Sequence, residues 1–144
     1  MEQIHATCID VGGTGVLILG PSGAGKSDLA LRLIDAGAVL VSDDRVDLRR
    51  DGEALIASPP DPIAGMLEVR GVGVVRMDSR AAVRIGLAVD LADPSAIERI
   101  PESAFCGYMG VSVPLLRLAP FEASAAAKLR LAVARLAGAV VPVP

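Results

Sequence analysis

Residues 20–27 of this 144-residue chain read GPSGAGKS and match the pattern G-x-x-x-x-G-K-[ST] at every constrained position. Glycines permit backbone conformations that turn successive N–H groups toward phosphate oxygens, and the helix that follows adds the positive end of its dipole. Lys26 can reach the β and γ phosphates, and the hydroxyl of Ser27 can bind Mg²⁺. The stretch therefore predicts a phosphate-binding loop (P-loop). Its residues are Gly20, Pro21, Ser22, Gly23, Ala24, Gly25, Lys26 and Ser27.

The flanking sequence supplies the context that this motif requires. Residues 16–19 form an apolar run typical of a buried strand, and apolar residues recur at helical spacing through residues 27–36. Gly37 stands where a helix commonly ends, and residues 38–41 form a second strand-like run. The order strand, Gly-rich turn, helix, strand predicts a βαβ unit with a right-handed crossover, and hence an α/β fold with a mostly parallel central sheet.

The rest of the chain adds a hairpin, further strands and a terminal helix. Asp51-Gly52 between strand-like residues predicts a β-hairpin over residues 46–56. Residues 67–75, 82–91 and 111–118 read as strands, the last of them an edge strand because of Pro114. Residues 122–139 are alanine-rich and predict a helix, with one apolar stripe formed by Leu129, Val133, Leu136 and Val140. We interpret residues 1–144 as a single α/β domain.

Composition excludes several function classes. The net charge of −3 and the pI near 5.1 argue against a nucleic-acid partner. No apolar run has the length of a membrane span, and the first residues lack the layout of a signal peptide, so we expect a cytoplasmic protein without membrane association. Cys8 and Cys106 are too few for a disulfide framework and read as small buried residues.

Two aspartates follow the second strand of the expected βαβ unit. A carboxylate at this end of a strand lies over the ligand crevice of an α/β sheet, where it can hold Mg²⁺ or accept a proton. Adjacent residues of an extended segment point opposite ways, so Asp43 and Asp44 both face the phosphates only if the chain turns there. A plain solvated Asp-Asp pair remains the alternative. By themselves, Glu68, His5 and Arg99 read as exposed or structural residues.

Taken together, these residues resemble HPr kinase/phosphorylase, in its catalytic C-terminal domain. The resemblance covers His5 to about Leu118. It rests on HATC (5–8), GPSGAGKS (20–27), LVSDDRVDL (40–48), LEVRGVGVV (67–75), ERI (98–100) and VPLLRL (113–118), in the family's order.

The resemblance implies a P-loop fold of the PEP carboxykinase-like type and a Mg²⁺- and ATP-dependent protein serine kinase. Its substrate would be HPr, the phosphocarrier of the bacterial sugar phosphotransferase system. In reverse, the family removes phosphate from phosphoserine by attack of inorganic phosphate, which yields pyrophosphate, and some members use pyrophosphate as the donor. A homohexamer is also implied.

Site residues follow by motif from the same resemblance. Lys26 and the backbone of residues 20–27 would hold the phosphates, and Ser27 and Glu68 would be the Mg²⁺ ligands.

The proton chemistry is implied for the acidic pair. By alignment, Asp44, with Asp43 beside it, would accept the serine proton in the forward direction and donate it in reverse. His5 would lie next to that carboxylate and tune it, and Arg99 would steady the transferred phosphoryl group.

The chain departs from the family's pattern in two places. The P-loop begins at residue 20, so we expect the N-terminal domain of better-known members to be absent, as in short alphaproteobacterial-type forms. After the VP strand the family carries a Pro-Gly-Arg loop associated with dephosphorylation. Here the chain reads LAPFEASAAAKLR, which leaves the phosphorylase direction open or moves that role to Lys128 or Arg130.

Two other function classes remain as alternatives. A nucleotide-sensing module would bind ATP and a partner without transfer, and would lack the base or the metal carboxylate. A kinase for another acceptor, such as a small molecule, would need an Arg-bearing lid, and no segment of the sequence reads as one.

Overall fold

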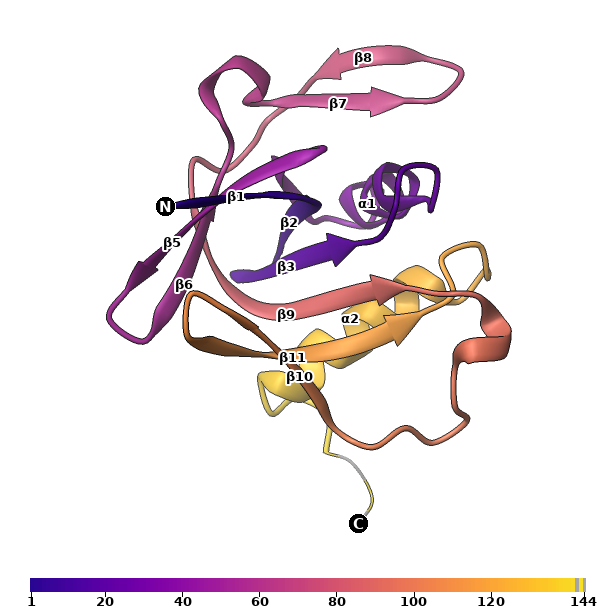
Figure 1. The fold of residues 1–144 in the computed structure, drawn as a ribbon. Helices are drawn as coiled ribbons and strands as arrows, with labels where there is room; N and C mark the ends of the chain where they lie inside the picture. Colours follow the sequence, from indigo (N-terminus) through magenta and orange to yellow (C-terminus); the bar gives the residue numbers. More distant parts are fainter. Residues whose placement is uncertain (142, 144) are drawn as a thin grey trace.

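A strongly curved sheet with two helices on one face forms the body of the protein (Figure 1). The computed structural model describes residues 1–141 and 143. The strands are β1 (Glu2–His5), β2 (Thr7–Val11), β3 (Thr14–Leu19), β4 (Val39–Ser42), β5 (Arg45–Asp51), β6 (Ala54–Ser58), β7 (Met66–Val69), β8 (Gly73–Arg76), β9 (Val83–Leu91), β10 (Ala104–Tyr108) and β11 (Val111–Leu118). The helices are α1 (Lys26–Asp35) and α2 (Ala125–Leu136), with short 3₁₀ turns η1 (Asp61–Ile63) and η2 (Pro94–Ala96).

Strand β9 lies at the centre of the nine-stranded sheet. The strand order is β1-β5-β6-β9-β3-β2-β4, and β11 pairs with β9 on one side and with β10 on the other. Within the part of the chain that the structure describes, β3 with β9 and β9 with β11 are the parallel pairs of this sheet. The remaining pairs are antiparallel. The prediction of a mostly parallel sheet is therefore wrong, although the α/β class holds.

The predicted βαβ unit differs because a strand lies inside it. β2 pairs with both β3 and β4 in antiparallel fashion, so the two strands joined by α1 run parallel without touching. β2 belongs to a hairpin with β3 whose turn contains Gly12 (φ 59°) and Gly13 (φ 97°). A Gly-Gly pair between strand-like residues is a known hairpin signal, so the sequence carried the information for this strand.

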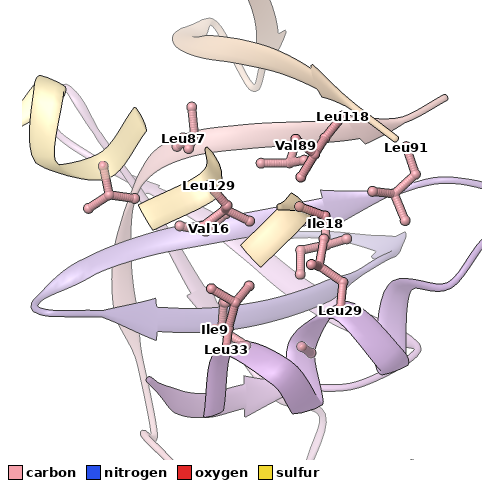
Figure 2. Packing of buried hydrophobic residues seen from close by; sticks show 13 residues of the cluster. Ile9, Val16, Ile18, Leu29, Leu33, Leu87, Val89, Leu91, Leu118 and Leu129 are labelled. Atoms are coloured by element: carbon pink, nitrogen blue, oxygen red, sulfur yellow. The ribbon is translucent and has the colours of Figure 1, made fainter. Parts of the chain in front are cut away.

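The sheet is buried on both faces, which explains the unbroken apolar run of β3. Val16 and Ile18 face the helices, and Leu17 faces the second core inside the curved sheet. Figure 2 shows Leu29 and Leu33 of α1, together with Leu129 of α2, packed against the sheet in the first core. This double burial fixes the end of β3, and with it the place where the Gly-rich turn begins.

Several sequence expectations agree with the structure and others need correction. The hairpin over residues 46–56 is β5–β6, and helix α1 lies where expected. Residues 67–75 form a separate hairpin, β7–β8, which stands off the large sheet (Figure 1). β11 is not an edge strand: Pro114 pairs with β10, and the pairing with β9 begins one residue later.

The terminal helix is shorter than expected. α2 ends at Leu136. Of the expected apolar stripe, Leu129 and Val133 are buried, whereas Leu136 and Val140 are exposed. Among residues 1–141 and 143, neither helix has the length and apolarity needed to cross a membrane.

Burial separates the two cysteines and predicts different thiol reactivity. Cys8 is fully buried, and this burial, with Asp10 nearby, raises the pKa of its thiol; partial burial also raises the pKa of Cys106. Because the thiolate is the reactive form, we expect Cys8 to resist alkylation at pH 8 until the protein unfolds, and Cys106 to react slowly in the native state. Mass spectrometry after iodoacetamide treatment, with and without guanidinium, would check this. Rapid labelling of native Cys8 would contradict the packing described here.

Candidate functional site

A cleft of about 440 Å³ opens where β3 ends and α1 begins. Residues from five separate segments meet in it, which sequence distance alone would not reveal. Its walls comprise His5, Thr7, Ser22, Gly23, Gly25, Lys26, Ser27, Asp28, Leu31, Asp43, Asp44, Glu68, Val69, Arg70 and Phe121.

The Gly-rich turn forms one wall of this cleft. It connects Leu19 with the first residue of α1, and all three of its glycines have a positive φ: Gly20 (154°), Gly23 (82°) and Gly25 (97°). Gly25 is the N-cap of α1, and its carbonyl accepts from Leu29 N at 2.9 Å. The positive end of the helix dipole therefore lies at the cleft, which favours an anionic group there.

Lys26 carries a positive charge into the same place. Only 7% of the residue is exposed, and its ammonium Nζ donates to the carbonyls of Gly20 (2.6 Å) and Pro21 (3.0 Å). A buried ammonium is costly without such partners, so these bonds hold both the lysine and the turn in one geometry. The arrangement concentrates positive potential beside the turn.

Asp43 connects four segments of the cleft. Its Oδ1 accepts from the hydroxyls of Ser27 (2.7 Å) and Thr7 (2.9 Å), and its Oδ2 accepts from the backbone N–H of Glu68 (3.2 Å). The residue is 7% exposed. The carboxylate thus ties the start of α1, strand β2 and strand β7 to the end of β4.

Asp44 also lines the cleft because the chain turns at this residue. Its φ of 69° is left-handed, a conformation that Asp and Asn tolerate better than most other side chains. Its carbonyl accepts from Ala6 N at 3.1 Å, which fixes the turn against the end of β1. Both aspartates therefore face the same cleft, which an extended segment would not allow.

His5 is the neighbour of Asp44. The imidazole Nδ1 lies 3.3 Å from Asp44 Oδ1, and both side chains are about half exposed or more (48% and 63%). His5 is the last residue of β1, a strand that is absent from the elements expected from the sequence. The pair lies at the open rim of the cleft, whereas Asp43 lies at its base.

The other two candidates, Glu68 and Arg99, differ in whether they line the cleft. Glu68 lines the cleft from β7, next to the aspartates. Arg99 is exposed in the segment after η2 and is not among the residues that line the cleft. Arg70, a residue to which the sequence motifs assign no role, does line the cleft.

The residues present fit a magnesium ion. The cleft contains a hydroxyl, Ser27, bonded to a carboxylate, Asp43, with a second carboxylate, Glu68, in the same walls. Within residues 1–141 and 143, no cluster of three His, Cys, Asp or Glu side chains could hold a metal without further ligands. Mg²⁺ is commonly bound by one or two carboxylates, with waters and substrate phosphates completing its shell, so this oxygen set suits it.

Three residues of the cleft are not predicted from the sequence. Thr7 bonds to Asp43, Arg70 comes from the β7–β8 hairpin, and Phe121 reaches the cleft from the loop after β11. Thr7 lies in the HATC stretch with His5, and Arg70 lies in the LEVRG stretch with Glu68, so both are near candidates in the sequence. Phe121 had no signal of this kind, because its position depends on how β11 returns to the Gly-rich turn.

Known proteins resemble the chain over most of its length. A family model described as "HPr Serine kinase C-terminal domain" matches residues 1–124. The "HPr kinase/phosphorylase" of Chlorobium limicola is 38% identical over 133 residues, covering 83% of this chain and 40% of that protein. The protein of the same name from Clostridium botulinum is 49% identical over 73 residues, covering 51% of this chain and 24% of the relative.

A solved structure agrees with the fold. "Structure of the Hpr(Ser) kinase/phosphatase from Coxiella burnetii" superimposes with a TM-score of 0.80 at 26% sequence identity, covering 96% of this chain and 95% of that chain. The chain spans less than half the length of the curated relatives described above.

The bonding of Asp43 predicts a difference in stability between the two aspartates. Asp43→Ala leaves two hydroxyls and one N–H without their acceptor, and we expect a loss of about 2 to 4 kcal/mol in the free energy of unfolding. Asp44→Asn keeps a side chain that tolerates the left-handed backbone, so its effect should stay within about 0.5 kcal/mol. Urea denaturation of both variants would measure this, and equal losses would show that Asp43 does not organise the cleft.

Proposed function

The chain belongs to the HPr serine kinase C-terminal domain family, and from this premise we propose that it transfers a phosphoryl group from Mg²⁺-ATP to a serine hydroxyl of the phosphocarrier HPr. The observation that carries the proposal is the meeting of the Gly-rich turn, Lys26, both aspartates and Glu68 in one cleft. Catalysis of phosphoryl transfer depends mainly on positioning and on stabilisation of negative charge. We interpret residues 1–144 as a single P-loop kinase domain of the PEP carboxykinase-like type.

Phosphate binding is assigned to the Gly-rich turn and the start of α1. The helix dipole and the Lys26 ammonium favour the β and γ phosphates at this position. Bound Mg²⁺ would neutralise charge on the phosphate oxygens, and Ser27, Asp43 and Glu68 would hold it. In addition to the two expected ligands, Asp43 enters this set because its carboxylate bonds to the Ser27 hydroxyl.

Asp44 is assigned as the proton acceptor. The serine oxygen of the acceptor forms a bond to the γ-phosphorus, the bond from that phosphorus to the bridging oxygen of ADP breaks, and the hydroxyl proton passes to Asp44 Oδ. His5 contacts the same carboxylate and would orient it and exchange protons with it. The exposure of both side chains supports an acceptor presented on a protein surface, because such a serine needs no enclosed pocket.

The reverse reaction is proposed as a second activity of the same groups. An oxygen of inorganic phosphate would form a bond to the phosphoserine phosphorus, and the bond from that phosphorus to the serine oxygen would break. Pyrophosphate would leave, and the serine oxygen would take a proton from Asp44. Arg70, which lines the cleft, is a better-placed cation for the transferred group than Arg99 in this conformation. The role of Arg99, the homohexamer and the cytoplasmic location stay predictions from the family resemblance.

Replacement of the proposed base tests the reaction. HPr from the same organism, Mg²⁺ and γ-labelled ATP should give acid-stable label on HPr, and Asp44→Asn should lower the rate by roughly 100-fold or more. Asp51→Asn, an exposed acid in the distant β5–β6 hairpin, is the matched control and should leave the rate unchanged. Excess inorganic phosphate added afterwards should release the label as pyrophosphate if the reverse activity exists.

Two outcomes would change the assignment. An unchanged rate in Asp44→Asn would remove this residue from the proton transfer. Bound ATP without any label on HPr would favour the nucleotide-sensing alternative or another acceptor.

A further inference from the structure

A second cavity, of about 450 Å³, adjoins the Gly-rich turn. We refer to it as the apolar cavity. It is lined by Pro21, Ala24, Leu91, Ala92, Asp93, Pro94, Ala119, Pro120, Phe121 and Glu122. Its size is that of a small-molecule site, and such sites are mostly apolar.

The cavity lies where three parallel neighbours of the sheet end. β3 ends at Leu19, β9 at Leu91 and β11 at Leu118, and the residues that follow each strand supply the walls. Ligands of α/β folds bind beyond the carboxyl ends of parallel strands. The apolar cavity therefore occupies the expected ligand position next to the phosphate-binding turn.

The charges of the apolar cavity argue against a second phosphate site. Its two charged lining residues are acidic, Asp93 and Glu122. Hydrogen bonds from Ser95 N (3.0 Å) and Ser95 Oγ (2.8 Å) lower the pKa of Asp93, which therefore stays ionised at neutral pH. Glu122 pairs with Lys128 at 2.8 Å. An uncharged ring with N–H groups suits these walls, and a phosphate does not.

Phe121 lies between the apolar cavity and the cleft of about 440 Å³ at the Gly-rich turn, which we refer to as the phosphate cleft. It lines both, and it is 74% exposed although it is a large aromatic residue. A Cβ added at Gly25 would lie 3.0 Å from the Phe121 ring, so the ring lies directly against the turn. An aromatic face in this place can stack on a planar base whose phosphates lie in the neighbouring cleft.

Arg32 holds the Phe121 segment in position. Its guanidinium donates to the carbonyls of Pro120 and Glu122 on either side of the phenylalanine, and it pairs with Asp28 at 3.2 Å. The loop after β11 is thereby attached to α1, the helix that begins at the Gly-rich turn. Arg32 is a positioning residue for this wall.

We propose that the apolar cavity binds the nucleobase of the phosphoryl donor, with Phe121 stacked on the base. The inference rests on the proposed function, because it assigns the rest of the donor to a cavity that shares the Phe121 wall with the phosphate cleft. A nucleoside triphosphate would occupy both the phosphate cleft and the apolar cavity, whereas pyrophosphate would occupy the phosphate cleft alone. The proposal therefore favours a nucleoside triphosphate as the donor.

Calorimetry with ADP and with pyrophosphate, each with Mg²⁺, separates the base from the phosphates. Loss of one aromatic–base stacking contact corresponds to a roughly 5- to 100-fold weaker affinity. We expect Phe121→Ala to weaken ADP binding by such a factor and to leave pyrophosphate binding within about twofold. Phe105→Ala is the matched control, an exposed phenylalanine of β10 outside both cavities.

A second variant tests the cavity without touching the phosphate cleft. Ala92 lines the apolar cavity and not the cleft, so Ala92→Phe should fill the cavity and weaken ADP binding selectively. Arg32→Met should give a smaller selective loss, because the ring stays present but is less firmly placed. Thermal unfolding of each variant would establish that it is folded.

The outcomes distinguish the two proposals. Unchanged ADP affinity in both Phe121→Ala and Ala92→Phe, or equal losses for ADP and pyrophosphate, would overturn the base site while the phosphate site stands. Absence of binding of either ligand to the wild-type protein would overturn the proposed function, and the base site with it.

Discussion

The carboxylate of Asp43 is the interaction on which the cleft depends. It accepts from a residue of α1, a residue of β2 and the backbone of β7, and it does so from the end of β4. These segments are distant in sequence, and β7 does not belong to the large sheet. A charged acceptor buried with three donors is well satisfied, and each donor would lose its partner if the carboxylate were removed. The Gly-rich turn and the β7–β8 hairpin are therefore held by the same carboxylate.

Local signals made the start of the site predictable. GPSGAGKS, the apolar run before it and the helical spacing after it are each short-range patterns, and β3, the turn and α1 lie where those patterns place them. Non-local pairing was not predictable in the same way. β2 forms a hairpin with β3 and also pairs with β4, so it separates the two strands that α1 joins. Both of these pairs are antiparallel, which makes the sheet mostly antiparallel.

The acidic pair shows the same limit at the level of single residues. Strand geometry predicts that Asp43 and Asp44 diverge, whereas the turn at Asp44 brings both to one cleft. The sequence places Glu68 and His5 only through family resemblance, and Phe121 not at all, since these positions depend on tertiary packing. Arg99 shows the reverse case, a residue singled out by its motif that lies away from the cleft in this conformation.

The left-handed backbone at Asp44 has a consequence for how this protein can evolve. Aspartate codons reach asparagine and glycine codons by single base changes, and both residues tolerate a φ of 69°. One point mutation can therefore remove the carboxylate and leave the fold and the cleft in place. Most other single-step exchanges at this position would strain the turn. Under the proposed function, a lineage that lost the chemistry would thus have a short genetic route from a transferase to a ligand-dependent regulator, with its stability retained.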